Sequence, residues 1–324
     1  MQHAIYRSDQ TDPFYNLAVE DMLFSMQSEG CTLYLWQNQN TVVIGKNQNA
    51  WKECRVQLLE QEGGRLARRS SGGGAVFHDL GNLNFTFLLP RKEYDVRRQL
   101  GVVQSAARAF GVETAFTGRN DLVISHSGAK FSGNAFRFSK TTALHHGTIL
   151  VDVDMHKLSR YLAPSQEKLA AKGVQSVRAR VENLAACNAD ITIASMRSAM
   201  MHAFIEAYGP AQVADLHAFD EAALHARTTE FSSWEWRMGA APAFDIVLEE
   251  RFLWGGIELQ LQLTKGHIAH AQVYSDAMDE AMIARIAPAL LGCAFRAEEM
   301  AAHVRNVGGA EAAEIADWLE AKEF

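Results

Sequence analysis

The sequence has few of the residues that mark small secreted proteins or cysteine-based metal modules. Its 324 residues include only four cysteines and six prolines. The cysteines are far apart, form no CxxC pair and show no His/Cys grouping at zinc-finger spacing. We therefore expect free thiols in a reducing cytoplasm at Cys31, Cys54, Cys187 and Cys293.

Long apolar runs and an excess of basic charge are also missing. No stretch approaches the roughly 18 apolar residues of a membrane span, and the start MQHAIYRSDQTDP has no signal-peptide pattern. The 31 basic and 38 acidic residues give a net charge of −7, which argues against a general affinity for nucleic acid. The sequence thus predicts a cytoplasmic protein with neither membrane nor nucleic-acid partners, whose anion binding is local.

Both common nucleotide-binding loops are absent as well. No GxxxxGK[ST] occurs, and no GxGxxG follows a strand pattern. Composition is otherwise that of a globular protein, with 48% hydrophobic and 21% charged residues, and the length favours two domains.

Apolar periodicity in the first part of the chain predicts several elements. A helix begins at Asp12 and Pro13, with apolar residues at helical spacing up to Met26. Residues 32–36 and 41–44 read as strands of one hairpin joined through NQN. A further helix is expected over 51–62, where Gly63 and Gly64 end it.

The middle of the chain mixes helices and strands without a regular βαβ rhythm. Residues 83–87 alternate, which predicts a strand with one packed face and a polar face carrying Asn82, Asn84 and Thr86. A helix is expected over 102–110. The remaining predictions here are strands over 122–125 and 148–152, and a helix over 191–208 capped by Asp190.

The pattern changes after Pro242. Alternating apolar residues from Ile257 to Tyr274, interrupted by Lys265-Gly266, predict a hairpin, and helical patterns follow to the end. We place a domain boundary near 240–246, giving domains 1–242 and 246–324.

The densest local signal is RRSSGGGAVFHD, residues 68–79. Three consecutive glycines, Gly72 to Gly74, let the backbone approach a ligand and turn N–H groups toward an anion, and Arg68 and Arg69 add charge. The alternative is a glycine-rich turn whose arginines are merely solvated.

A second signal joins GRNDL at 118–122 to GAKFSGNA at 128–135. Lys130 stands between glycines among small and apolar residues, where a lysine suggests a specific anion. Asp121 is suited to hold a ribose hydroxyl or a magnesium ion. The alternative is a solvated surface lysine.

Two further groups carry weaker signals. On a strand, His145 and His146 point to opposite faces and so cannot easily share one ion; we expect structural histidines, with His146 a possible pocket-lining group. Residues 157–180 hold six basic residues against Glu167, which indicates a phosphate-binding or docking surface, or simply a basic helix face.

Together these segments resemble one family. RRSSGGGAVFHDLGNLNFTF, GRNDL, GAKFSGNAFR, HHGTIL and KLAAKGVQSVRARV follow in the order and spacing of bacterial two-domain lipoate-protein ligases, relatives of biotin-protein ligases and octanoyltransferases. The resemblance covers nearly all the chain and weakens towards its end. It implies an α+β fold: a catalytic domain of mixed sheet and helices like the core of class II aminoacyl-tRNA synthetases, plus a small α/β C-terminal domain.

The resemblance also implies an activity. Lipoate and magnesium-ATP give lipoyl-AMP and pyrophosphate, and the lipoyl group then passes to a lysine of lipoyl domains of 2-oxoacid dehydrogenase subunits or of the glycine-cleavage H protein, in lipoate salvage. Lys130 matches the catalytic lysine, Asp121 a magnesium ligand, and Lys130, Ser71 and His146 the lipoate contacts. The residues implied for ATP or lipoyl-AMP are Arg69, Ser71, Gly72, Gly73, Gly74, Ala75, Val76, Phe77, Asp121, Lys130, Lys172 and Arg178.

Three alternatives stay open. An octanoyltransferase needs a nucleophilic cysteine, and none lies between Cys54 and Cys187, the interval that holds these motifs. A biotin-protein ligase would carry a GRGRxxR-like loop where RRSSGGGAV stands. A protein that binds lipoate or nucleotide without turnover would have no need of the whole set of motifs.

Overall fold

The chain forms two compact units. The computed structural model describes residues 3–46, 48–117, 121–162, 181–239, 244–275, 277 and 279–324. One unit comprises residues 1–46 and 63–232, and the other residues 47–62 and 233–324. The segment 47–62 therefore groups with the C-terminal part of the chain, although it lies far before the predicted boundary at 240–246.

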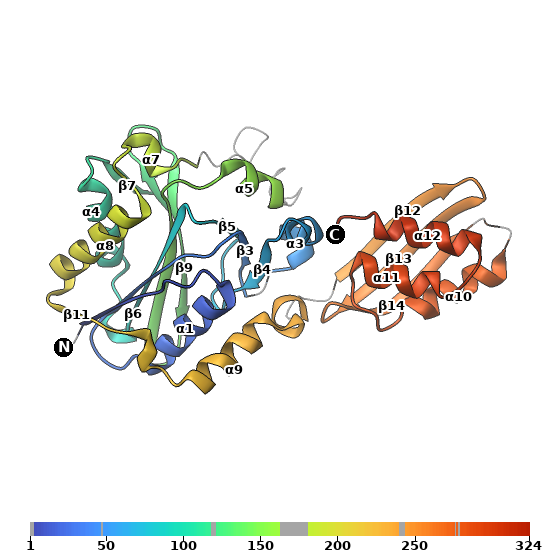
Figure 1. The fold of residues 1–324 in the computed structure, drawn as a ribbon, viewed down its shortest axis with the longest axis horizontal. Coiled ribbons are helices and arrows are strands. Elements are labelled where there is room, and N and C mark those ends of the chain that lie inside the picture. The colour runs from blue at the N-terminus through green and yellow to red at the C-terminus, as the bar shows by residue number, and fades with distance from the viewer. Residues whose placement is uncertain are drawn as a thin grey trace. The chain divides into compact units, whose positions relative to one another are not determined.

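A mixed sheet is the centre of the first unit (Figure 1). Within the described residues it has eight strands in the order β11-β1-β2-β6-β10-β9-β8-β7. The first three are parallel, and each later pair is antiparallel. The strands are β1 (His3–Arg7), β2 (Thr32–Trp36), β6 (Asn82–Pro90), β7 (Thr114–Thr117), β8 (Asp121–Ile124), β9 (Lys130–Phe138), β10 (Thr142–Leu150) and β11 (Ala211–Val213).

Helices α4 (Val96–Arg108) and α8 (Ile193–Tyr208) pack on one face of this sheet, where one apolar cluster joins them to Leu83, Phe85 and Phe87 of β6. Helix α1 (Pro13–Met26) confirms the helix predicted for these residues. It contacts β6 and β10, and α9 (Glu221–Ser232) packs against it. The Asp12 carboxylate caps α1 by accepting from the Phe14 and Tyr15 amides at 2.8 and 3.1 Å.

A second, small sheet in this unit corrects one prediction. It has the order β4-β3-β5, formed by Arg65–Arg68, Thr41–Ile44 and Val76–His78. The predicted hairpin of 32–36 with 41–44 is wrong, because β2 pairs with β1 and β6 whereas β3 pairs with β4 and β5. Every residue of both strands is buried, which is typical of interior strands that need a neighbour on each side.

Three other predictions are corrected in detail. The expected helix over 51–62 is two short helices, α2 (Ala50–Glu53) and α3 (Val56–Gln61), because Cys54 adopts an extended conformation between them. The cap of α8 is Thr192 and not Asp190, since the Thr192 hydroxyl accepts from the Ser195 amide at 3.1 Å. Strand β6 is buried on both faces, so its polar face is not open to solvent.

The other predicted elements are present with longer or shifted bounds. Residues 102–110 fall mostly in α4, which starts at Val96 because Asp95 caps it. The predicted strands over 122–125 and 148–152 correspond to β8 and to the end of β10. Short elements complete the unit: η1 (Arg91–Glu93), α5 (Met155–Tyr161), α7 (Leu184–Cys187) and η2 (Leu216–Ala218).

The second unit contains the predicted hairpin and helices. Strands β12 (Phe244–Phe252), β13 (Gly255–Thr264) and β14 (His267–Ser275) form an antiparallel sheet. Alternate residues of β13, from Ile257 to Leu263, pack with α10 (Glu280–Leu290), α11 (Ala297–Arg305) and α12 (Ala310–Glu320). Lys265 and Gly266 both have positive φ, as a tight hairpin turn requires. The short η3 (Glu235–Gly239) also belongs here.

The segment 47–62 is held in the second unit by specific contacts. The Trp51 ring lies 5.6 Å from that of Phe295 and 6.3 Å from that of Trp234. Arg296 donates to the Glu60 carboxylate at 2.7 Å, and the Gln57 amide donates to the Phe324 carbonyl at 3.3 Å.

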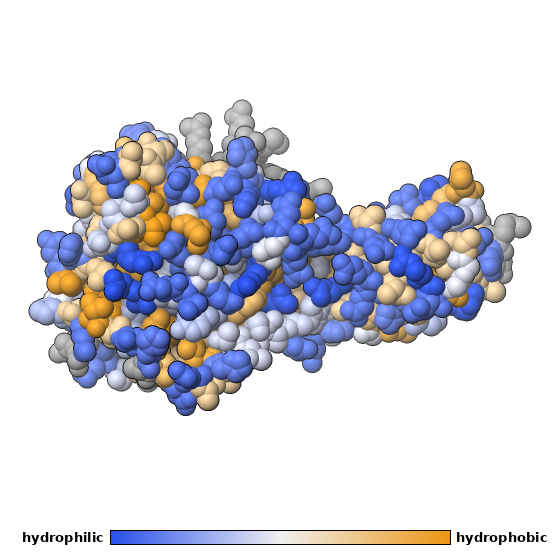
Figure 2. Space-filling model, in the orientation of Figure 1, coloured by the Kyte–Doolittle hydropathy of each residue, from blue (hydrophilic) through white to orange (hydrophobic). Residues whose placement is uncertain are grey.

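Polar side chains predominate on the face of each unit shown in Figure 2, and apolar side chains form small separate groups there. No described helix is both long and apolar enough to cross a membrane. The apolar residues are instead concentrated in the two cores.

We predict that Phe85→Ala lowers the unfolding free energy of the first unit by about 3 to 5 kcal/mol, because it leaves a cavity in a fully buried cluster. Phe116→Ala, at a side chain 46% exposed, is the control and should cost no more than about 0.5 kcal/mol. Urea-dependent hydrogen exchange of β6 and β10 peptides reports on this unit alone. Equal losses in the two variants would contradict the assigned core.

Candidate active site

A cavity of about 130 Å³ lies in the first unit, between the large and the small sheet. Its walls come from α1, from strands of both sheets and from the glycine-rich segment after β4. The lining residues are Leu17, Trp36, Val43, Arg69, Gly73, Gly74, Ala75, Val76, His78, Asn84, Lys130, Gly133, Asn134, Ala135, His146, Gly147 and Thr148. Distant parts of the sequence therefore meet at one site.

The Arg69 guanidinium organises the glycine-rich loop. Its Nη2 donates to the Gly72 and Gly74 carbonyls at 2.6 and 2.8 Å, and its Nη1 donates to the Val43 carbonyl at 3.2 Å. Its Nε donates to Ser71 Oγ and again to the Gly72 carbonyl, both at 3.1 Å. Burial lowers the pKa of Arg69 to about 10, so the side chain remains a cation at neutral pH. Most of its donors are thus used on the protein's own loop.

This arrangement determines where the loop amides point. In a trans peptide the N–H lies opposite the C=O, so carbonyls of Gly72 and Gly74 drawn toward Arg69 turn the amides of Gly73 and Ala75 away from it. Both residues line the cavity, and neither amide donates a hydrogen bond within the described part of the chain. Backbone N–H groups left without an internal partner in this way favour an anion beside the loop.

Two glycines are required for this close packing. A Cβ on Gly45 would lie 2.3 Å from the Gly73 carbonyl oxygen. Gly73 itself has a φ of +91°, and a Cβ there would lie 2.9 Å from Arg69 Nη2.

A buried hydrogen-bond chain connects the loop to the sheet. Ser71 Oγ lies 2.7 Å from His146 Nε2, and His146 Nδ1 lies 2.8 Å from Glu20 Oε1. Because the Glu20 carboxylate can only accept, the His146 ring donates to it from Nδ1. Thr86 also donates to Glu20 at 2.6 Å. The chain fixes Ser71 and His146 in place.

Lys130 faces the loop from strand β9. Its Nζ lies 2.8 Å from Asp121 Oδ1 on β8, and both side chains are about one-third exposed. A Cβ on Gly133 would lie 2.9 Å from that Nζ, so the missing side chain at 133 leaves the space that the amine occupies.

A β-bulge explains how Lys130 reaches the cavity. Leu122 pairs with Ser132 but Val123 pairs with Lys130, so β9 carries an extra residue, Phe131. In an unbroken strand, residues 130 and 133 would face opposite sides. The bulge turns Phe131 into the apolar core and Lys130 to the side of Gly133.

Two fully buried histidines flank this region. Burial lowers the pKa of both His78 and His145 to about 3, so both rings are neutral. The His145 ring nitrogens lie 2.8 Å from the side-chain amides of Gln99 and Asn134, in the core. A neutral ring donates to the oxygen of one amide and accepts from the NH2 group of the other. His78 lines the cavity, where its Nε2 has no hydrogen-bond partner among the described residues.

Most of the predicted site residues lie at the cavity or in contact with its lining. Arg69, Lys130, His146 and Gly73 to Val76 line the cavity, and Ser71, Gly72 and Asp121 contact these residues. His145 and His146 point to opposite faces of β10, as predicted, and both are hydrogen-bonded. Phe77 is buried against Tyr161, with ring centroids 5.5 Å apart, and is not a lining residue. Lys172 and Arg178 lie outside the described residues.

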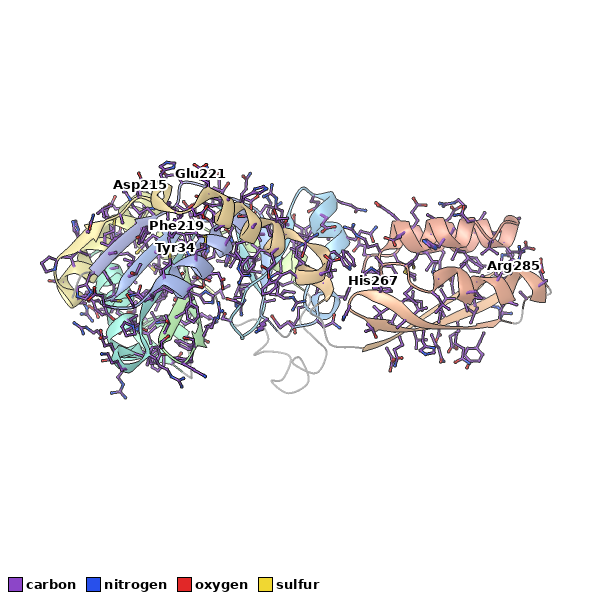
Figure 3. All side chains as sticks on the ribbon, turned by 90° about the horizontal axis from the view of Figure 1, so that it is seen from below. Tyr34, Asp215, Phe219, Glu221, His267 and Arg285 are labelled. Atoms are coloured by element: carbon purple, nitrogen blue, oxygen red, sulfur yellow. The ribbon has the colours of Figure 1, made fainter. Side chains whose placement is uncertain are left out.

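Several residues of the cavity and of its hydrogen-bond chain had no strong signal in the sequence. Trp36 and Asn84 sit in strands whose polar or aromatic side could equally face solvent, and Glu20 lies in a helix beside apolar residues. One indication of these residues was present in the sequence, the predicted polar face of the strand over 83–87. In the structure, Asn84 of that face lines the cavity and Thr86 donates to Glu20. Tyr34, labelled in Figure 3, is a further polar group on that side of the sheet, and its hydroxyl donates to Asn16 at 3.0 Å.

Comparison with known families agrees with this architecture. Residues 12–205 match the model of the lipoyl protein ligase A/B catalytic domain, and residues 241–319 match that of the bacterial lipoate protein ligase C-terminus. The two models together span most of the chain.

Solved structures give the same result. The Plasmodium falciparum protein LipL1, in complex with lipoate, is 26% identical, aligns over 99% of this chain and 100% of its own, and has a TM-score of 0.65. The bipartite lipoate protein ligase of Thermoplasma acidophilum, described with its E2 lipoyl domain, is 28% identical over 74% of this chain and 97% of its own, with a TM-score of 0.65. A lipoate-protein ligase A bound with ATP is 25% identical over 74% and 100%, with a TM-score of 0.63.

The fold is thus that of a lipoate ligase catalytic domain, with a large mixed sheet and helices, followed by a C-terminal domain. The chain belongs to the lipoate-protein ligase family, whose enzymes attach lipoate to protein.

The buried neutral histidines predict a pH dependence of stability. The unfolded chain binds protons on His78 and His145 below about pH 6.5, whereas the folded protein does not until about pH 3, so stability falls as the pH falls between these values. We predict that His145→Gln reduces this slope by about 1.4 kcal/mol per pH unit. Urea unfolding of wild type and variant at pH 6.0, 5.5 and 5.0 measures the difference. Equal slopes would contradict a neutral His145.

Proposed function

We propose that this enzyme activates free lipoate with ATP to lipoyl-AMP and transfers the lipoyl group to a lysine of apo lipoyl domains of 2-oxoacid dehydrogenase subunits or of the glycine-cleavage H protein. Its role is lipoate salvage in the cytoplasm. The observation that carries the proposal is that Lys130 lines the same cavity as Gly73 and Ala75, whose amides point away from Arg69.

The first half-reaction brings two anions together. When the lipoate carboxylate attacks the α-phosphate, a cation between them offsets their repulsion as charge builds at phosphorus. Lys130 supplies that cation, and the Gly73 and Ala75 amides supply donors to phosphate oxygens. Arg69, whose donors hold the loop, acts chiefly by fixing those amides.

The second half-reaction uses the same ammonium. Attack of the acceptor amine on the acyl carbonyl gives a tetrahedral oxyanion, and Lys130 is placed to donate to it. Loss of one such donor costs on the order of 100- to 1000-fold in rate. The pairing with Asp121 holds the amine in position before either step.

The cavity suits the lipoyl end of the substrate better than a whole nucleotide. About 130 Å³ is close to the size of cavity, roughly 150 Å³, that admits a benzene ring. Trp36, Leu17 and Val43 supply apolar walls for a dithiolane ring and its alkyl chain. The proposed lipoate contacts of Ser71 and His146 lie at the polar end, where the hydrogen-bond chain to Glu20 orients them.

Asp121 fits a role in binding magnesium-ATP. One carboxylate oxygen pairs with Lys130, and the other is available to an ion that also takes phosphate oxygens. Magnesium sites of this kind need only one or two carboxylates besides the substrate. The ion would lower the negative charge on the phosphates.

We assign residues 1–242, apart from the segment 47–62 that groups with the second unit, to the catalytic domain and 246–324 to an accessory domain. Lys172 and Arg178, outside the described residues, are proposed from the family resemblance to contact the adenylate. The octanoyltransferase alternative is disfavoured, since no cysteine lines the cavity in the described part of the chain.

We predict that Gly133→Ala slows pyrophosphate release by on the order of 10- to 100-fold, because the added Cβ displaces the Lys130 amine from its position. The protein should still fold, since the far end of a lysine can move. Gly101→Ala, whose Cβ would meet nothing within 4 Å, is the matched control and should retain full activity. Unchanged activity in Gly133→Ala would contradict the placement of Lys130.

Intact mass spectrometry of an apo lipoyl domain tests the whole proposal. Incubation with the enzyme, lipoate, magnesium and ATP should add one lipoyl group, while omission of ATP or the change Lys130→Ala should abolish the addition. Addition without ATP would refute the adenylate route. Neither addition nor pyrophosphate release would favour a binding protein, and normal transfer by Lys130→Ala from added lipoyl-AMP would refute its role in the second step.

A further inference from the structure

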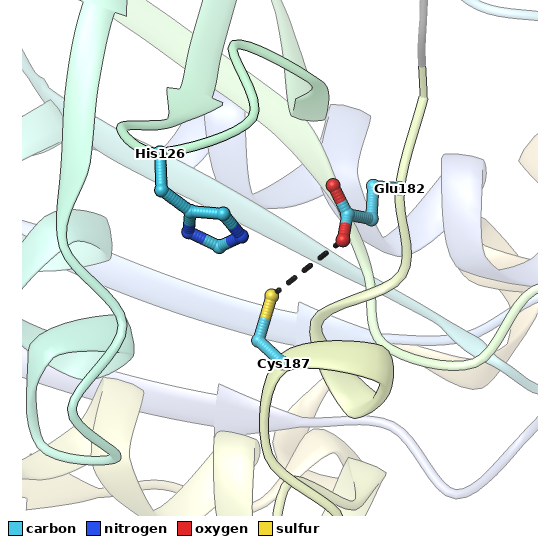
Figure 4. Close-up of side chains that lie close together, drawn as sticks. All are labelled: His126, Glu182 and Cys187. Carbon is cyan, nitrogen blue, oxygen red and sulfur yellow. Dashed lines mark hydrogen bonds between the residues drawn. The ribbon is translucent and has the colours of Figure 1, made fainter.

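A group of metal-ligating side chains lies outside the cavity. His126, Glu182 and Cys187 bring a ring nitrogen, a carboxylate oxygen and a thiol sulfur within 4.8 Å of one another (Figure 4). The three residues come from two segments, the turn between β8 and β9 and the chain around α7. His126 lies far from the other two in the sequence, so no short motif indicates the group.

We propose that His126, Glu182 and Cys187 form a binding site for one Zn²⁺ ion. The inference is independent of the ligase reaction. A thiolate and an imidazole together favour zinc or another late first-row ion over magnesium and calcium, which prefer oxygen ligands. Three protein ligands leave one of the four tetrahedral positions, which water takes because His126 is exposed.

The distances are close to those that zinc requires. Given bond lengths of about 2.0 to 2.3 Å, ligand atoms around a tetrahedral zinc ion stand roughly 3.3 to 3.8 Å apart. Cys187 Sγ lies 3.9 Å from Glu182 Oε1, which already matches. An inward movement of about 1 Å by the exposed His126 ring closes the remaining gap. The thiol proton leaves when the sulfur binds the ion.

The backbone around these residues is held in place. Gly128 N donates to the Ile124 carbonyl at 2.8 Å and closes the turn that carries His126. On the other segment, Ala185 N donates to the Val151 carbonyl at 3.0 Å. Asn183, between the two ligands of that segment, exchanges hydrogen bonds with the Val153 backbone at 2.9 and 3.0 Å. Such support limits the rearrangement that binding needs.

The carboxylate of Glu182 is also hydrogen-bonded to a neighbouring side chain, as the ligands of metal ions usually are. Ser127 Oγ donates to Glu182 Oε2 at 2.7 Å, which leaves Oε1 toward Cys187. Ser127 Oγ is itself held by the Ala129 amide at 3.2 Å. Hydrogen-bonding of this kind orients a ligand carboxylate.

The proposed zinc site adjoins β9, the strand that carries Lys130. The Glu182 amide donates to the Lys130 carbonyl at 3.1 Å, and Val181 forms a parallel bridge with Lys130. A zinc ion would therefore tie the turn after β8 and the chain before α7 together beside β9. The site's affinity can nevertheless be measured without any turnover.

Zinc titration of the untagged, chelator-treated full chain tests the proposal. Isothermal titration calorimetry with Zn²⁺ should give one site that a large excess of Mg²⁺ does not block. His126→Ala and Cys187→Ser should each weaken binding more than about 100-fold, and Ser127→Ala about 10- to 100-fold. His225→Ala, at an exposed histidine of the same unit, should leave it unchanged. Absence of binding by wild type, or equal affinity in Cys187→Ser, would overturn the site.

Alkylation of the unaltered protein gives a second test that does not depend on variants. Zn²⁺ should slow the reaction of Cys187 with iodoacetamide at least tenfold, as quantified on its peptide by mass spectrometry. Co²⁺ should produce the charge-transfer absorption of a cobalt–thiolate bond, which Cys187→Ser removes. An unchanged alkylation rate at saturating zinc would overturn the proposal.

Discussion

The buried guanidinium of Arg69 is the interaction on which the rest of the site depends. A loop with three successive glycines has many accessible conformations, and only one of them turns the amides of Gly73 and Ala75 outward. Arg69 selects it by binding the carbonyls of Gly72 and Gly74 from the protein side. The desolvated cation is balanced by the buried Glu20 carboxylate, which reaches the same loop through His146 and Ser71. The same contacts therefore neutralise the buried charge of Arg69 and set the conformation of the glycine-rich loop.

Arg69 and Lys130 illustrate two uses of positive charge in one site. Arg69 is 6% exposed and acts on the protein, whereas Lys130 is one-third exposed and acts on what enters the cavity. The planar guanidinium suits several carbonyls at once, and the flexible ammonium suits reacting oxygens whose positions change. Exchanging the two residue types would serve neither purpose.

The sequence was informative wherever the chemistry was local. The helix from Pro13, the alternation of β6 and the hairpin of β13 and β14 follow from periodicity and turn residues, and the glycine loop and Lys130 stand out by their unusual neighbours. It failed where pairing partners decide the outcome, because Thr32–Trp36 and Thr41–Ile44 look like one hairpin yet belong to different sheets. The bulge at Phe131 could not be predicted either, since it depends on the register between β8 and β9. Glu20 and Trp36 entered the site only through tertiary packing.

The placement of residues 47–62 in the second unit has a consequence for synthesis. Trp51 leaves the ribosome well before Phe295, the ring against which it packs. At about 5 to 20 residues per second, the 244 residues from position 52 to position 295 take roughly 12 to 50 s to translate. During that time β3 and β4 can pair around a segment whose own partners do not yet exist. The nascent chain thus carries an exposed aromatic side chain for most of its elongation, which makes this segment a natural contact for chaperones that hold the chain until its C-terminal part emerges.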